Sequence, residues 1–217
     1  MMLAGESAAA VKATIDKGVA ADKSMPTGTG LFVRTADVAR SSARSGDFQS
    51  TVQAWNRPEA LAMNYYDYTT NGGHSDVAHR SNILFYETGA AKVPTLFTNT
   101  YVPGAVADHL TSSGGDLFGN PGVFNNGQMS ILLWLEAGVT ASYGTETEPC
   151  AFPQKFPQAS VLVKNYFAGN TVGEAYLKSV AWPAQGVLVG DPMARPFGTK
   201  ATLVNGNLRI TTTSLAG

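Results

Sequence analysis

Residues 100–150 carry the clearest structural pattern: TYVPGAVADHLTSSGGDLFGN (100–120), GQMSILLWLEAG (127–138) and VTASYGTETEPC (139–150). A short apolar run leads into a polar turn, and an amphipathic segment, a second apolar run and a polar loop follow. Strand, polar loop, helix, strand and polar loop in this order are typical of a parallel α/β sheet. Ligands of such sheets gather beyond the carboxyl ends of the strands. We therefore expect any site of this protein at that edge.

The rest of the chain alternates in the same way. Helices are predicted from the N-terminus to Gly18 and over residues 37–55, 128–137, 159–167 and 172–180; strands are predicted over 30–35, 61–68, 82–86, 95–97, 104–107, 139–143 and 187–189. Residues 104–107 and 139–143 should be parallel neighbours joined by the 128–137 helix. An Asn-Gly pair at 205–206 predicts a hairpin over residues 200–213. The predicted fold is α/β, a single three-layer αβα domain over 1–217 with a largely parallel sheet.

Composition narrows the possible functions. The net charge is −1 and no basic run forms a patch, which argues against a nucleic-acid or anionic-membrane partner. No apolar stretch approaches the roughly 18–20 residues of a membrane helix, so no membrane insertion is expected. A single cysteine forbids an internal disulfide. Charged residues are only 14% of the chain and Gly, Asn, Ser and Thr are frequent, which favours an exported protein.

Five strings together resemble an uncharacterised bacterial protein family: PGAVADHLTSSGG, WLEAGVTASYGTETEPC, KFP, EAYLKSV and GDPMARPF. Members of that family usually carry an export signal and occur in genomes that encode exosortase, a membrane enzyme that sorts exported proteins. The resemblance implies an extracellular or periplasmic location. Family members extend further at the N-terminus, so it also implies that this chain is the C-terminal part of a longer protein and lacks one or more leading strands. We then expect an uncovered sheet edge or apolar face near residues 1–17, through which another chain would associate.

A more distant resemblance is to the gingipain-type cysteine peptidases, which have a caspase-like fold. GAVADHLTSSGG, QMSILLWLEAG, VTASYG and VLVGDP follow one another as the corresponding elements do in those peptidases, over roughly residues 80–195. In that layout the peptidase histidine falls within residues 87–91 and the cysteine within 110–112, and neither segment contains the required residue. The resemblance thus implies a non-peptidase relative that acts as a surface binding or scaffold module.

The residues also permit an alternative, a cysteine hydrolase or peptidase. His109 closes one predicted strand and Cys150 follows the next, with Glu148 nearby to orient the imidazole. A thiolate and a histidine from neighbouring strand ends are what nucleophilic attack on a carbonyl requires. The other interpretation of Cys150 is a small buried residue.

The polar turn between these two strands is a separate candidate binding site. Its residues are Asp108, Thr111, Ser112, Ser113, Gly114 and Gly115. Hydroxyls and backbone N–H groups at a strand end would suit an anion or a carbonyl oxygen. The same composition is equally typical of a tight turn that satisfies its own backbone. No Walker pattern occurs, and no cofactor is expected.

A second polar loop contains His74 and His79 near Asp67 and Asp76. Two histidines and two carboxylates are ligands for a transition metal. Their spacing matches no compact ligand motif, so a solvated loop is the favoured interpretation and no metal site is predicted.

Overall fold

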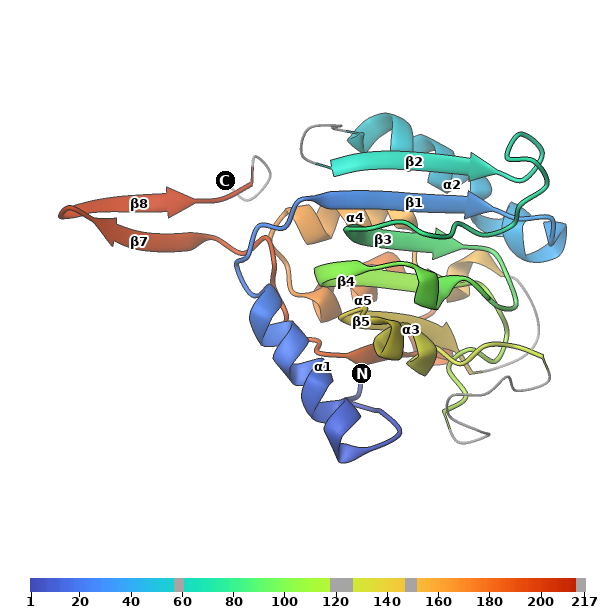
Figure 1. Cartoon of the computed structure of the whole chain (residues 1–217), viewed down its shortest axis with the longest axis horizontal. Helices are drawn as coiled ribbons and strands as arrows, with labels where there is room; N and C mark the ends of the chain where they lie inside the picture. Colours follow the sequence, from blue (N-terminus) through green and yellow to red (C-terminus); the bar gives the residue numbers. More distant parts are fainter. Residues whose placement is uncertain (57–60, 118–126, 147–151, 214–217) are drawn as a thin grey trace.

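The computed structural model describes residues 1–56, 61–117, 127–146 and 152–213 (Figure 1). A six-stranded sheet forms its centre, in the order β2-β1-β3-β4-β5-β6. The strands are β1 (Gly28–Arg34), β2 (Leu61–Asp67), β3 (Ile83–Thr88), β4 (Tyr101–His109), β5 (Ala141–Thr145) and β6 (Gly186–Gly190). The first five are parallel, and β6 runs antiparallel to β5. The predicted, largely parallel sheet is confirmed.

Helices cover both faces of the sheet, which confirms the three-layer αβα arrangement (Figure 1). They are α1 (Ala8–Ala21), α2 (Val38–Trp55), α3 (Leu132–Ala137), α4 (Ala159–Phe167) and α5 (Val172–Ser179). Helices α2, α4 and α5 pack on one face and α3 on the other, while α1 packs along β4 and β6. Among the described residues, no helix combines the length and apolarity needed to cross a membrane.

Alternate residues of each central strand enter opposite layers of the core, as the period of a β-strand requires. In β3, the ring of Phe85 lies 5.8 Å from that of Tyr166 in α4. The next residue, Tyr86, lies 5.1 Å from Trp134 in α3, between ring centroids. All six residues of β3 are buried, because helices or loops cover both of its faces.

Strands β4 and β5 are parallel neighbours joined through α3, as predicted, with Val106 opposite Ala141. The helix begins at Leu132 rather than at the predicted Gln128. Residues before it bond to the neighbouring loops instead of continuing a helix: the Met129 N–H donates to the Ala91 carbonyl and the Ile131 N–H to the Gly114 carbonyl.

One predicted strand is wrong. Residues 95–97 belong to a turn that leads into the 3₁₀ helix η1 (Leu96–Thr98). The Thr98 N–H and hydroxyl both donate to the Thr95 carbonyl, at 2.9 and 2.7 Å. This local bonding by a threonine side chain competes with strand pairing, and a three-residue apolar pattern carries no signal against it.

The chain changes direction at the carboxyl ends of β1 and β3. After β1 it enters α2, on one face of the sheet. After β3 it enters the segment containing Val93 and Leu96, which packs on the other face. Neighbouring strands whose connections leave toward opposite faces create the crevice in which open α/β sheets bind ligands.

The C-terminal hairpin formed by β7 (Lys200–Val204) and β8 (Asn207–Thr211) extends away from the sheet (Figure 1). Its turn has positive φ at Asn205 and Gly206, 51° and 78°, as predicted for an Asn-Gly hairpin. Four apolar residues lie opposite one another on one of its faces: Ala201, Leu203, Leu208 and Ile210. All four are exposed.

The N-terminal segment lies at the edge of the sheet. Met2 bridges Val189 of β6, and its N–H donates to the Leu188 carbonyl at 2.9 Å. Met1 and Leu3 are exposed, as is Ile15 in α1. Association of another chain with this apolar surface stays a prediction.

Candidate functional site

A crevice of about 320 Å³ opens at the carboxyl edge of the sheet, where β1 and β3 end. Hydroxyl, carboxylate, ammonium and small apolar groups line it: Thr35, Asp37, Ser75, Asp76, Ala90, Ala91, Lys92 and Pro94. Its position is the direction change between β1 and β3, where the topology of the sheet predicts a ligand. The crevice is therefore the candidate site that the fold itself supports.

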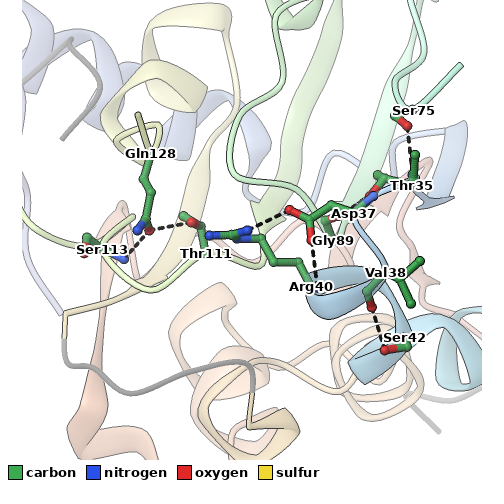
Figure 2. Close-up of polar contacts among 11 residues, drawn as sticks. Thr35, Asp37, Val38, Arg40, Ser42, Ser75, Gly89, Thr111, Ser113 and Gln128 are labelled. Carbon is green, nitrogen blue, oxygen red and sulfur yellow. Dashed lines mark hydrogen bonds and ion pairs between the residues drawn. The ribbon is translucent and has the colours of Figure 1, made fainter. Parts of the chain in front are cut away.

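Thr35, the residue after β1, holds the base of this crevice together (Figure 2). Its hydroxyl donates to the Gly89 carbonyl at 2.5 Å and accepts from the Asp37 N–H at 3.2 Å. Its own N–H donates to the Ser41 hydroxyl at 2.7 Å. One buried threonine thus connects the ends of β1 and β3 to the first turn of α2.

Gly89 allows the first turn of α2 to approach the end of β3 closely. A Cβ atom at Gly89 would lie 2.4 Å from Cα of Ser41 and 2.7 Å from the Arg40 carbonyl oxygen. Both contacts are with backbone, which cannot move aside as a flexible side chain would. A glycine after β3 is therefore a packing requirement of the crevice.

Asp37 caps the N-terminus of α2 at the rim of the crevice. Its carboxylate accepts from the Arg40 N–H at 3.2 Å and pairs with the Arg40 guanidinium at 2.7 Å (Figure 2). The Ser75 hydroxyl accepts from the Ala36 N–H at 2.9 Å and so brings the loop after β2 against the same turn. Carboxylate and hydroxyl oxygens grouped here suit a ligand that donates hydrogen bonds.

The polar turn predicted as a binding site lies two strands away, at the end of β4. The Thr111 hydroxyl and the Ser113 N–H both donate to Oε1 of Gln128, at 2.5 and 2.8 Å (Figure 2). The Thr145 hydroxyl donates to the carbonyls of Thr111 and Ser112, at 2.8 and 3.0 Å. Much of the polar surface of the turn is thus bonded within the protein.

Gly115 of that turn permits close packing of the backbone, while Gly114 packs less tightly against the His109 ring. A Cβ at Gly115 would lie 2.6 Å from the Gly144 carbonyl oxygen. The Gly115 N–H donates to the Thr145 carbonyl at 2.9 Å. A Cβ at Gly114 would lie 3.4 Å from the His109 ring. These contacts favour the structural interpretation of the turn.

His109 is fully buried and both of its ring nitrogens are bonded. Nε2 lies 2.8 Å from the Met129 carbonyl oxygen, and Nδ1 lies 3.1 Å from the Trp134 indole nitrogen. A carbonyl can only accept and an indole N–H can only donate, so the ring is neutral with its proton on Nε2. Burial lowers the pKa of His109 to about 4. Cys150 and Glu148, its proposed catalytic partners, lie outside the described residues.

Asp108 is also fully buried and lies away from the crevice, on the α2 side of the sheet. It forms an ion pair with Arg44 of α2, which also pairs with Glu87 of β3. Sequence reasoning assigned Asp108 to the polar turn and did not identify Arg44 or Glu87. The available signal was one charged residue within each of two otherwise apolar strand ends.

The histidines of the second polar loop, His74 and His79, are both exposed. Within the part of the chain that the structure describes, no group of three or more His, Cys, Asp or Glu side chains is placed to hold a metal ion. Asp76, from the same loop, instead lines the crevice.

No protein-family model matches this sequence, and no curated protein or solved structure is significantly similar to it.

Proposed function

We propose that this chain is a ligand-binding module without peptidase chemistry, in the layout of the gingipain-type peptidases, and that its ligand occupies the crevice between β1 and β3. The observation that carries the proposal is the crevice itself, which lies at the direction change of the sheet and whose described lining contains neither histidine nor cysteine. The turns in which that layout would carry the catalytic pair, 87–91 and 110–112, also lack both residues.

The burial of His109 supports the same conclusion. A general base must present a free nitrogen lone pair within reach of the proton that it removes. The Nδ1 lone pair of His109 accepts from Trp134, and Nε2 donates to Met129. Its lowered pKa makes it a poor base at neutral pH.

The lining indicates the chemistry of the ligand. Asp37, Asp76 and Ser75 offer acceptor oxygens beside the Lys92 side chain, and a volume of about 320 Å³ is in the range of small-molecule pockets. A small molecule or a peptide end that carries amino or hydroxyl groups fits this surface. The resemblance to an exported bacterial family supports a role at the cell surface or in the periplasm.

The experiment is a titration of the ¹⁵N-labelled protein with glycinamide, an amine donor, with sodium acetate as a probe that only accepts. Glycinamide should shift the amide signals of residues 35–37 and 75–76, on the carboxylate and hydroxyl side of the crevice, and acetate should leave those signals unchanged. Ala91→Trp fills the crevice and should abolish the shifts, whereas Ala20→Trp, on an exposed position of α1, should retain them. Shifts confined to the polar turn at 111–115, or none, would contradict the proposal.

A further inference from the structure

Three charged side chains are buried together between α2 and the sheet. Arg44 is 3% exposed, and Glu87 and Asp108 are both 0% exposed. The Arg44 guanidinium donates from Nη1 to Asp108 and from Nη2 to Glu87. Glu87 and Asp108 are opposite each other on β3 and β4, so their side chains leave the same face of the sheet. Both carboxyl groups therefore contact the same guanidinium.

Each carboxyl group uses one oxygen for Arg44 and has one left over. Among the described residues, Oε1 of Glu87 and Oδ2 of Asp108 are buried and accept no hydrogen bond. Two carboxylates beside one guanidinium would also leave a net negative charge in the low-dielectric core, which is strongly unfavourable. Both problems disappear if one carboxyl group is protonated, because its O–H then donates to the other.

We propose that Glu87 and Asp108 hold a single proton between them at neutral pH, so that the core of this domain contains a proton-binding site. With Arg44 positive and one carboxylate negative, the cluster is neutral. The proton belongs to the pair rather than to either residue, as for other carboxyl pairs in contact. The proposal is independent of the ligand of the crevice.

Among the described residues, the other ionisable groups that act on this cluster include two tyrosines and Asp47. Tyr143 of β5 and Tyr176 of α5 are buried close to Asp108, and neither hydroxyl has a described hydrogen-bond partner. Burial raises the pKa of both phenols, so they stay neutral and can donate. Asp47 of α2 acts on Arg44 from the same helix. Burial and the neighbouring Asp108 raise the pKa of Glu87 well above its usual value.

The pair does not line the crevice, but it contacts α2, the helix whose N-terminal cap, Asp37, does. Glu87 is two residues before Gly89, and Arg44 is in α2, the helix that Asp37 caps. Loss of the proton would leave two carboxylates repelling each other under α2. Proton binding is thereby coupled to the contact between α2 and the strand ends that form the crevice.

The test compares urea unfolding of the wild type and of Glu87→Gln from pH 7 to pH 9. The folded pair keeps its proton while the unfolded glutamate has lost it, so the wild-type folding equilibrium constant should fall by up to tenfold per pH unit until the pair is deprotonated. Glu87→Gln supplies a permanent N–H donor and should remove this slope. Asp16→Asn, an exposed carboxyl-to-amide change on α1, should retain it.

Two further outcomes decide the nature of the site. Asp108→Asn alone should fold, since Glu87 then ionises beside Arg44, whereas the double amide variant leaves Arg44 buried without an anion and should unfold. Equal pH slopes in the wild type and in Glu87→Gln would overturn the proposal. A wild-type stability at pH 8 that differs between potassium, sodium and tetramethylammonium chlorides would also overturn it, because a bound cation would then take the place of the proton.

If Glu87→Gln does not fold, infrared spectroscopy of the wild type gives the answer directly. A protonated buried carboxyl group has its own C=O stretching band at pH 7, which should shift when glutamate and aspartate are labelled with ¹³C. The absence of such a band would overturn the proposal.

Discussion

The hydroxyl of Thr35, one residue beyond β1, donates a 2.5 Å hydrogen bond to the carbonyl of Gly89, one residue beyond β3. It joins two strand ends whose chains then leave toward opposite faces of the sheet. The crevice opens beside this bond, so its shape depends on a contact between backbone and one small side chain.

Replacing Thr35 by valine should therefore damage the crevice more than its small volume change suggests. Valine keeps the shape but leaves the buried Gly89 carbonyl and the Asp37 N–H without this partner. We expect a loss of about 1–3 kcal/mol in the free energy of unfolding and loss of the glycinamide shifts. Thr35→Ser keeps the hydroxyl and should retain those shifts. Equal behaviour of the two variants in urea unfolding would show that the bond is unimportant.

Gly89 and Gly46 form a matched pair of glycine-to-alanine changes. At Gly89 the new Cβ meets the backbone of α2, and we expect a loss of about 1–3 kcal/mol. At Gly46, inside α2, nothing lies within 4 Å of the new Cβ. Because alanine has a better helix propensity than glycine, Gly46→Ala should raise the free energy of unfolding by about 0.5–1 kcal/mol. Chemical denaturation checks both, and a tolerated Gly89→Ala would contradict the packing described here.

His109 should make stability depend on pH in the acid range. Its folded pKa of about 4 lies below the unfolded value of roughly 6.5. The unfolded chain therefore binds the proton first, and the stabilising contribution of the neutral ring is lost as the pH falls from about 6.5 to 4. The side-chain amide of His109→Gln can still donate and accept. Relative to this variant, the free energy of unfolding of the wild type should fall by up to about 3 kcal/mol over this pH range. An unchanged difference between the two proteins would mean that the ring is accessible to protons.

The C-terminal hairpin should contribute little to the stability of the domain. Both strands are exposed, and an isolated hairpin is marginal by itself. Removal of residues 200–211, the two strands and their turn, should leave the Tm nearly unchanged. Phe197→Ala, just before the hairpin, removes a buried ring 4.4 Å from that of Phe167 and should cost about 3–5 kcal/mol. A large drop in Tm after the deletion would show that the hairpin packs on the domain.

The fold was readable from the sequence because its signals are local. Apolar runs bounded by turns located β1 to β6, and the Asn-Gly pair located the hairpin. The spacing of strands and helices could not give the order of strands in the sheet, and that order decides where the crevice lies. The sequence therefore predicts a site at the end of β4, where the residues are chemically more varied, whereas the crevice lies at the ends of β1 and β3.

The charged residues of the core also show that a sequence pattern does not reveal contacts between residues far apart in the chain. Asp108 is visible in the sequence as a polar residue at a strand end, and nothing local distinguishes a rim position from a buried one. Its burial follows from Arg44, which is 64 residues away in the chain. Partners so distant in sequence are brought together only by the packing of α2 on the sheet.

The most direct test of the absence of peptidase chemistry is the rate at which iodoacetamide alkylates Cys150 as a function of pH, in the wild type and in His109→Gln. An unactivated thiol reacts as its thiolate forms, near its ordinary pKa of about 8.5. The binding-module proposal predicts that profile in both proteins. Fast alkylation at neutral pH that slows when His109 is replaced would reveal a thiolate–histidine pair and contradict it.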